Sequence, residues 1–422
     1  MREMPMLASV ALHGVIHTMN VAGQGLARLG HQPVALDEGS ILEEVCRQTG
    51  LDDFGGDEFR DPLRRLLHAY ESEARLTLLG RIAARGDTTT LLTNRLRLVE
   101  DRKRNPGIAE QRIVRPLFIV GLPRTGSTLL HHLLAQDPTS RVAQGWEVMM
   151  PSPPPERARY ETDVRIARFQ RQLRWFDRIA PEFKKIHPLG AQLPLECLAI
   201  MAHSFLSQRF HTMYRVPTYQ AWLLGQDTRA AYHLHRRFLQ HLQWGTQADR
   251  WVLKAPSHVF AFEALFDAYP DALIVQTHRD PVTVLASVAS LTAVLRCAFS
   301  DHVDLVEIGH EVTRHWVEGL SRVLKARRDG RIPTDRFLDV SYRELVHEPL
   351  AVVGRIYAHF DAPFTPEART RMHGYLASNP QDRNGRHRYS LSSFGLDRDD
   401  LTRRFQAYCA QIGIDREEST VC

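Results

Sequence analysis

The spacing of apolar residues predicts that the chain begins with a helical part. Between about residues 37 and 99, apolar side chains recur at every third or fourth position, as at Leu63, Leu66 and Leu67, which is the repeat of an amphipathic helix. Glycines stand near the ends of these segments and are expected to terminate them. We interpret residues 1–112 as an N-terminal helical region that serves packing or oligomerisation rather than a separate activity. Its expected helices are ILEEVCRQTG, DPLRRLLHAYESEARLTLLGRIAARG and TTLLTNRLRLVEDRKR.

From Pro116 onward, short apolar runs alternate with segments of helical spacing. This alternation is typical of a parallel sheet covered by helices on both faces. The sequence therefore predicts an α/β domain over residues 113–422, with a central parallel sheet flanked by helices. The expected strands are LFIV at 117–120, WVLKAP at 251–256, ALIVQTHRD at 272–280 and RFLDVSY at 336–342.

A proline-rich segment interrupts this alternation. PSPPPE, at 151–156, stands between the first strand–turn–helix unit and a long helical stretch of about 163–247. We interpret about 156–247 as a helical insert in the α/β domain. It is rich in Trp, Phe, Tyr and Met at helical spacing, so core packing is the expected role of most of these side chains.

Composition adds limits rather than a function. The chain has 422 residues, of which 43% are hydrophobic and 24% charged, and it contains no apolar run near the ~20 residues of a membrane-spanning helix. The N-terminal MLASVALHGVIHTMN lacks a clear cleavage site and is expected to be part of the folded protein or a loosely held arm, not a secretory leader. The net charge of +5 fits an anionic ligand without identifying one.

The cysteines indicate a reducing compartment. They are odd in number and far apart, and they form no CxxC pair, so neither a disulfide framework nor a zinc site is indicated. A cytoplasmic location is therefore expected. The cysteines are Cys46, Cys197, Cys297, Cys409 and Cys422.

The stretch GLPRTGST, from Gly121 to Thr128, follows the first expected strand and begins a helix. Such a loop presents backbone N–H groups and the positive end of the helix dipole, which together favour an anion. The glycines allow the tight turn, Ser127 and Thr128 add hydroxyl donors, and Arg124 adds a guanidinium. The frame is that of a P-loop, so the sheet is predicted to be P-loop-like. The alternative is a glycine turn that merely joins strand to helix.

Ser127 occupies the place of the lysine that nucleoside triphosphatases direct at the β and γ phosphates. No apolar strand ends in the acidic pattern that holds magnesium in those enzymes. A triphosphate with its metal is therefore disfavoured. No set of histidines and carboxylates has the spacing of a metal site either, and no metal is expected.

A second junction of strand and helix occurs at ALIVQTHRDPVTVLASVASL. Asp280 and Pro281 are explained as a helix start, with the acid as the cap and the proline at the first position. Arg279 is not explained in this way, because it stands at the carboxyl end of an expected parallel strand, where open α/β sheets bind ligands. Ser287 interrupts an apolar series two turns into the helix. Together with the first loop, these residues indicate two anion-binding points on one ligand.

A nucleotide with phosphates at both ends of its ribose has two such points, and here the chain resembles the sulfotransferases that use 3′-phosphoadenosine-5′-phosphosulfate. PRTGSTLL resembles the family's 5′-phosphosulfate loop in its arginine-bearing version, THRDPVTVLAS the 3′-phosphate motif, and VSYRELVHEP the segment whose tyrosine contacts adenine. The resemblance covers about residues 112–413 and is strongest to a diverse bacterial branch. It implies a phosphosulfate site at Arg124, Thr125, Gly126, Ser127 and Thr128, a 3′-phosphate site at Arg279 and Ser287, and an adenine contact at Tyr342.

Transfer to a hydroxyl requires a base within hydrogen-bond reach of the acceptor proton. Glu147, in GWEVMM, matches in placement the glutamate base of protein-tyrosine and some bacterial sulfotransferases, and its alternative is a helix cap or an ion pair with an arginine. His258 follows a strand lysine, as the histidine base of cytosolic sulfotransferases does, although four residues after it rather than two. A third alternative is transfer without a dedicated base.

Lys254 ends the strand WVLK and stands where the family's lysine stabilises charge on the leaving group, so it joins Arg124 among the expected catalytic residues. Near the C-terminus, GRHRYSLSSFGL resembles the late loop that reaches the 3′-phosphate, which makes Arg386 and Arg388 candidates against a simple solvated basic run. The other histidines are expected to be structural.

The sequence thus predicts a sulfotransferase that acts on a hydroxyl of a small-molecule or lipid-like acceptor, with the insert forming the acceptor pocket. The rival readings are an ATP-dependent small-molecule kinase and a non-catalytic nucleotide-binding protein of the same fold. No nucleic-acid partner and no stable membrane insertion are expected, and a homodimer is left open. The identity of the acceptor does not follow from the sequence.

Overall fold

The computed structural model describes residues 4–183, 188–246, 249–380 and 390–414, with residues 4–13 described by their backbone alone. Its centre is an all-parallel sheet of five strands in the order β2-β3-β1-β4-β5. This confirms the predicted α/β class. The strands are β1 (Leu117–Gly121), β2 (Ser140–Arg141), β3 (Arg250–Lys254), β4 (Leu273–His278) and β5 (Phe337–Ser341).

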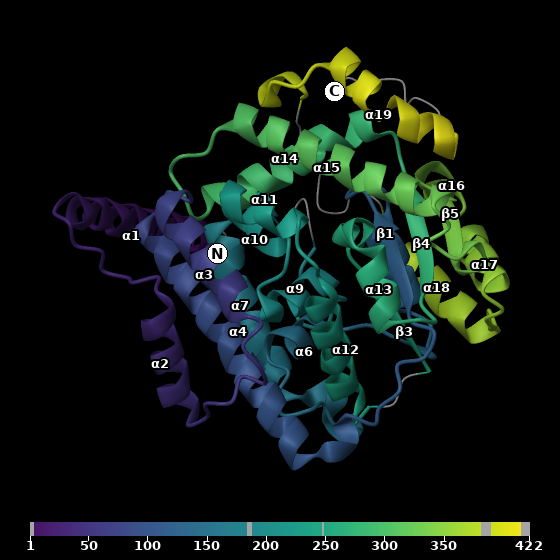
Figure 1. Ribbon diagram of the computed structural model, residues 1–422, viewed down its shortest axis with the longest axis horizontal. Coiled ribbons are helices and arrows are strands. Elements are labelled where there is room, and N and C mark those ends of the chain that lie inside the picture. The colour runs from purple at the N-terminus through teal and green to yellow at the C-terminus, as the bar shows by residue number, and fades with distance from the viewer. Residues whose placement is uncertain (1–3, 184–187, 247–248, 381–389, 415–422) are drawn as a thin grey trace.

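The sheet is covered on both faces. Successive side chains of a strand point to opposite faces, so β1, β3, β4 and β5 each contribute to two separate clusters of buried residues. On one side of β1, Leu117 and Ile119 pack in one buried cluster with residues of α5, α17 and α18, whereas Phe118 and Val120 belong to a larger cluster on the other side. Figure 1 shows α14 and α15 crossing above the strands. The helices that follow β1 are α5 (Ser127–Leu134), α6 (Gly145–Met149), α13 (Phe262–Ala268), α14 (Pro281–Cys297), α15 (Leu305–Arg328), α16 (Tyr342–His347), α17 (Pro349–His359), α18 (Pro366–Ser378) and α19 (Arg398–Ile412).

The register brings the predicted motifs to one edge. Gly121 pairs with Thr277 of β4, and Ile119 pairs with Lys254 of β3, so the carboxyl ends of these three strands lie next to one another. After β1 the chain forms β2 and β3, which lie to one side of β1 in the strand order. It then forms β4 and β5, which lie to the other side of β1. Ligands of open α/β sheets bind outside the carboxyl ends of the strands at such a point.

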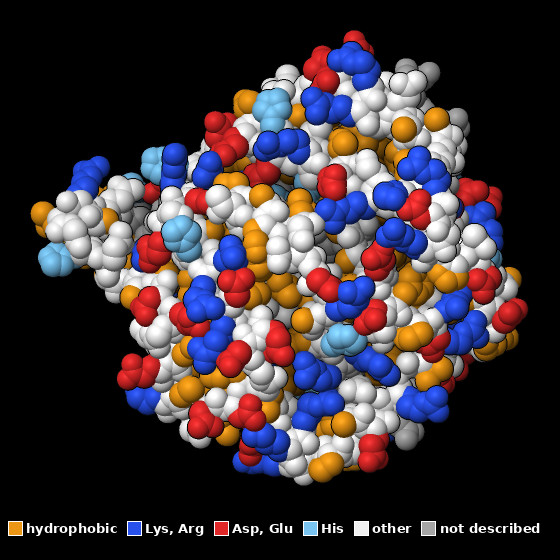
Figure 2. Space-filling model, viewed as in Figure 1, with side chains coloured by type: hydrophobic (Ala, Val, Ile, Leu, Met, Phe, Trp, Pro, Cys, Tyr) orange, Lys and Arg blue, Asp and Glu red, His pale blue; other side chains and the backbone are white. Residues whose placement is uncertain are grey.

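The N-terminal helices are α1 (Met4–Arg28), α2 (Glu38–Thr49), α3 (Arg60–Ser72) and α4 (Leu78–Arg104). The predicted second helix in fact breaks at residues 73–77, where Arg75 has a positive φ of 47° and Thr77 caps α4. Gly86, expected to end a helix, lies inside α4. Buried residues of α3 and α4 share one core with Phe118. Figures 1 and 2 show α1 projecting from the body of the molecule.

The stretch of about 163–247, predicted to be helical, consists in its described part of several separate helices. Irregular segments that contain Pro188 and Pro194, and a turn at Gly225, divide them, because proline and glycine interrupt helical hydrogen bonding. The pieces are α7 (Val164–Ile179), α9 (Cys197–Met201), α10 (Arg209–Met213), α11 (Pro217–Leu224) and α12 (Arg229–Gln243). The short 3₁₀ helices of the chain are η1 (Pro106–Ile108), η2 (Arg157–Thr162), η3 (Ala202–Ser204), η4 (Pro256–Phe260), η5 (Thr334–Arg336) and η6 (Ser392–Phe394).

Two further features concern the surface. None of the helices in the described ranges is both long and apolar enough to cross a bilayer. On the face seen in Figure 2, acidic and basic side chains are interspersed with apolar ones. Opposite charges therefore lie close together over this face.

Candidate active site

A cavity of about 1110 Å³ opens at the carboxyl edge of the sheet. One part of its wall comes from the loop after β1 and from the ends of β3 and β4. The rest comes from helices, chiefly α4, α7, α10, α14 and α15. The predicted residues that border it are Arg124, Gly126, Ser127, Thr128, Lys254, Arg279 and Tyr342.

The loop after β1 has the shape of an anion cradle. Gly121 and Gly126 have positive φ angles of 124° and 84°, which L side chains rarely adopt. A β-carbon on Gly121 would lie 2.4 Å from the carbonyl oxygen of Thr277, and one on Gly126 would lie 2.8 Å from a methyl carbon of Leu345. Only glycine therefore fits at either position without a shift of its neighbours.

Thr125 holds this loop to the sheet. Its hydroxyl donates to the carbonyl oxygen of Leu122 at 2.7 Å and lies 2.5 Å from the hydroxyl of Thr277. Because the side chain is buried and engaged in this way, only the backbone N–H of Thr125 remains for an anion. Ser127 and Thr128, by contrast, reach the cavity at the start of α5.

Arg279 and Tyr342 come together beside the loop. The guanidinium of Arg279 lies over the Tyr342 ring, 4.1 Å from its centroid, and one of its nitrogens lies 3.5 Å from the carbonyl oxygen of Arg124. A β-carbon on Gly126 would stand 3.2 Å from the same tyrosine ring. The three motifs predicted to bind one nucleotide are thus neighbours. Ser287 lies in the interior of α14 with 2% of its surface exposed, and it is absent from the described lining of the cavity.

Lys254 is buried at the end of β3 and forms an ion pair with Glu196. Both residues border the cavity. Sequence reasoning missed Glu196, which directly precedes α9 in the irregular part of the insert. The only available signal was its position after Pro194, and that does not distinguish it from other acids.

Glu147 is fully buried and does not border the cavity within the described chain. One carboxylate oxygen pairs with Arg141, and the other accepts the backbone N–H of Gln144 at 2.9 Å in a capping box at the start of α6. Both alternatives that the sequence left open for this residue, a helix cap and an arginine partner, are therefore present. The geometry disfavours Glu147 as the base.

His258 is also fully buried and away from the described cavity wall. Its Nδ1 lies 2.7 Å from the hydroxyl of Tyr232, and its ring meets Phe118 edge-on at a centroid distance of 5.1 Å. Burial holds the pKa of this imidazole well below its ordinary value, so the ring stays neutral. It packs the sheet rather than meeting a substrate.

Of the remaining predicted residues, Arg386 and Arg388 lie outside the described part of the chain. The other histidines have structural partners: His131 bonds the backbone of β3, His132 bonds Tyr375 and His235 bonds Tyr269. Within the described residues, no group of three or more His, Cys, Asp or Glu side chains is placed to hold a metal ion.

The cavity continues away from the loop between helices. It follows one face of α14, where Val288, Leu291 and Leu295 border it at intervals of three or four residues. Opposite walls come from Phe169, Leu173 and other apolar residues of α7 and from α4, in which Gly86 leaves room because a β-carbon there would meet no atom within 4 Å. A long apolar chamber thus adjoins an anion cradle, as in a transferase with a charged donor and an apolar acceptor.

Comparison with known proteins agrees with this class. The sequence profile of the sulfotransferase family matches residues 116–366. The crystal structure of sulfotransferase STF1 from Mycobacterium tuberculosis is 34% identical, with a TM-score of 0.79 over 88% of this chain and 98% of that one. The structure of STF9 from Mycobacterium avium is 28% identical, with a TM-score of 0.81 over 92% of this chain and 100% of that one.

A third similar protein is the omega-hydroxy-beta-dihydromenaquinone-9 sulfotransferase of Mycobacterium bovis. It is 26% identical over 274 residues, which are 63% of this chain and 67% of the relative. The chain therefore belongs to the sulfotransferase family and is an enzyme that transfers a sulfuryl group.

Proposed function

We propose that the enzyme transfers a sulfuryl group from 3′-phosphoadenosine-5′-phosphosulfate to a hydroxyl of an elongated, lipid-like acceptor. The observation that carries this proposal is that a cradle of glycines, hydroxyls and cationic side chains opens into an apolar chamber within one continuous cavity. The name of the relative that sulfates a menaquinone derivative supports an acceptor of this kind.

The donor would lie across the neighbouring motifs. The loop from Arg124 to Thr128 would hold the 5′-phosphosulfate through backbone N–H groups, the hydroxyls of Ser127 and Thr128 and the guanidinium of Arg124. Arg279 would bind the 3′-phosphate, and Tyr342, whose ring already carries this guanidinium, would contact the adenine. Ser287 would join the 3′-phosphate only after a shift of the groups that bury it.

The chemical step would take place between Lys254 and Glu196. The acceptor oxygen forms a bond to sulfur as the bond from sulfur to the 5′-phosphate oxygen breaks, and the charge on that leaving oxygen is stabilised by the ammonium of Lys254. The acceptor proton would pass to Glu196, since this carboxylate borders the cavity whereas Glu147 and His258 do not.

Calorimetric titration of the product nucleotide, 3′-phosphoadenosine 5′-phosphate, in the presence of a metal chelator tests the donor assignment. We expect the wild-type protein to bind and Arg279→Ala to bind at least about tenfold more weakly, because the substitution removes a charge-assisted contact with a phosphate. Arg371→Ala, on the exposed side of α18, serves as the control and should bind as the wild type does.

Equal binding by the wild type and Arg279→Ala would contradict the 3′-phosphate site. Binding of ATP that requires magnesium, with no binding of the product nucleotide, would favour the kinase reading instead. Nucleotide binding without transfer of labelled sulfate from the donor to any lipid-like alcohol would contradict the proposed acceptor class.

A further inference from the structure

The end of the cavity remote from the donor loop is polar. The cavity is bordered by Arg279, just before α14, and then by the face of α14 from Val288 to Leu295. Because an α-helix rises 1.5 Å per residue, Thr292 lies about 16 Å along the helix from Pro281. Between these points α14 presents Val288 and Leu291 to the cavity, but around Thr292 the wall also contains His211 and Thr212 of α10 and His315 of α15.

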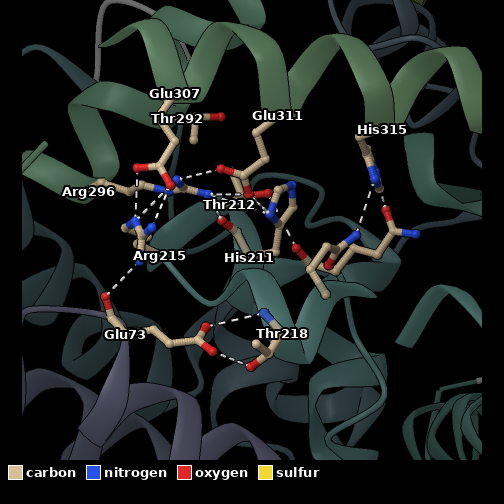
Figure 3. Close-up of polar contacts among 12 residues, drawn as sticks. Glu73, His211, Thr212, Arg215, Thr218, Thr292, Arg296, Glu307, Glu311 and His315 are labelled. Atoms are coloured by element: carbon tan, nitrogen blue, oxygen red, sulfur yellow. Dashed lines mark hydrogen bonds and ion pairs between the residues drawn. The ribbon is translucent and has the colours of Figure 1, made fainter. Parts of the chain in front are cut away.

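His211 is held at this end by a buried ion pair. Its Nδ1 lies 2.7 Å from a carboxylate oxygen of Glu311, and Arg296 donates to both oxygens of that carboxylate at 2.8 and 2.9 Å. Arg296 also donates to the backbone carbonyl of His211 at 2.8 Å. His211 and Arg296 have only 5% and 3% of their surfaces exposed. Figure 3 shows the ring of His211 between α10 and the helices α14 and α15, which carry Arg296 and Glu311.

This arrangement fixes the role of one ring nitrogen. Burial by itself would raise the pKa of Glu311, but the charges and hydrogen bonds of His211 and Arg296 outweigh it and hold that pKa far below its ordinary value. An ionised carboxylate only accepts hydrogen bonds, so Nδ1 of His211 must donate to it. Nε2 is then the ring nitrogen that is left for another partner.

The other polar groups nearby are engaged with the protein. The hydroxyl of Thr212 donates to the carbonyl oxygen of Gln208, and that of Thr292 to the carbonyl oxygen of Val288. Both ring nitrogens of His315 have glutamine partners. By contrast, no described residue bonds to Nε2 of His211, although the residue borders the cavity and is nine-tenths buried. A buried polar atom of this kind favours a ligand that supplies a hydrogen-bonding group.

We propose that Nε2 of His211 forms a hydrogen bond with a hydroxyl at the far end of the acceptor, so that the enzyme selects elongated apolar molecules with a polar group at each end. The assignment of the sulfuryl group to the end of the acceptor near the donor loop rests on the proposed function. The binding of a hydroxyl at the far end of the cavity does not depend on that function.

The test compares two ligands on two proteins. Dodecanediol, with a hydroxyl at each end, and dodecane, which has no hydrogen-bonding group, are titrated into the wild type and His211→Phe without donor. Binding is followed by the fluorescence of Trp175 and Trp316, which border the cavity. We expect the ratio of the two dissociation constants to favour the diol about tenfold more in the wild type than in the variant, since phenylalanine cannot form the hydrogen bond.

A wild-type protein that binds both ligands equally, or that does not bind the diol, would overturn the proposal. So would a variant that keeps the full preference. His211→Gln keeps a hydrogen-bonding side chain and should retain part of the preference, which protects the test against misfolding of the phenylalanine variant. Because no donor is present, failure of sulfate transfer in the test of the proposed function would leave this result unchanged.

Discussion

Two glutamates have different surroundings, from which we expect different roles. Glu147 has one oxygen on Arg141 and the other on a backbone N–H, and it is fully buried. Glu196 pairs with Lys254 at the cavity wall, where a substrate can reach both side chains. A buried pair that loses one partner leaves an uncompensated charge, whereas a carboxylate at a cavity can exchange partners.

Substitution of each glutamate by glutamine is expected to separate stability from catalysis. Glu147→Gln should lower the free energy of unfolding in urea by about 3 kcal/mol, because Arg141 stays buried without its counter-ion, and the folded fraction should retain its turnover rate. Glu196→Gln should lower kcat about a hundredfold or more through loss of the base, at a smaller cost in stability. A stable Glu147→Gln protein with that loss of kcat would instead identify Glu147 as the base.

For individual residues, the sequence predicted the kind of contact that a side chain makes better than the residue with which it makes that contact. Residues for a donor site could be proposed, because glycine, hydroxyl and arginine in a fixed spacing after a strand are typical of an anion-binding loop, and the structure places Arg124, Arg279 and Tyr342 side by side. The pairing of Lys254 with Glu196 could not, since the two are 58 positions apart and the intervening segment has no regular pattern. Long-range ion pairs depend on the fold and leave no local signal.

At the scale of elements, the turn between β1 and α5 depends on close approach of two backbones. Gly121 faces a carbonyl group of β4, which cannot move without disturbing the sheet, whereas Gly126 faces the side chains of Leu345 and Tyr342. The two glycines of this loop are therefore required by close contacts with different neighbours.

Alanine at these positions should have different consequences. Gly121→Ala is expected to destabilise the whole protein, seen as a lower urea midpoint, because backbone atoms of the sheet must separate. Gly126→Ala should cost less stability but displace Tyr342, and so weaken binding of the product nucleotide about tenfold in calorimetry. If both variants lost stability equally and Gly126→Ala bound normally, the proposed link between the loop and Tyr342 would be wrong.

The elements themselves were predictable where their pattern was strong. β1, β3, β4 and β5 were each expected within a residue or two. Apolar runs mark strands that are buried on both faces, as β1, β3 and β4 largely are, whereas β5 is only partly buried. β2 has only Ser140 and Arg141 and lies at the edge of the sheet, so it has no pattern to detect. The insert was expected as a long helical stretch, because apolar residues keep their helical spacing on both sides of its breaks. The positions of the breaks depend on tertiary packing and could not be predicted from this spacing.

At the scale of the whole molecule, the core contains several histidines. His203, His235 and His241 are buried, and burial lowers the pKa of His203 and His241 to about 4 and that of His235 to about 3. Their rings are therefore neutral in the folded protein over a range of pH in which the unfolded chain would protonate them.

Stability should fall on acidification for this reason. The ordinary pKa of histidine is 6.5, and that of His203 in the fold is about 4, so unfolding takes up a proton between these values and the stability contributed by the neutral ring is lost as the pH falls. Each such ring gives a slope of about 1.4 kcal/mol per pH unit. Urea unfolding at several pH values should show a shallower slope for His203→Gln, by about one proton, and an unchanged slope for His373→Gln on exposed α18. Equal slopes in all three proteins would contradict this account.

The ion pair of Lys254 and Glu196 also has a consequence for the order of events in turnover. Without donor, the ammonium of Lys254 is paired with the carboxylate that we propose as the base. A phosphosulfate that takes over Lys254 releases Glu196, so an acceptor that enters first meets an occupied carboxylate, and one that enters second meets a basic one. The enzyme is thereby expected to follow a compulsory order, in which the nucleotide arrives first and departs last.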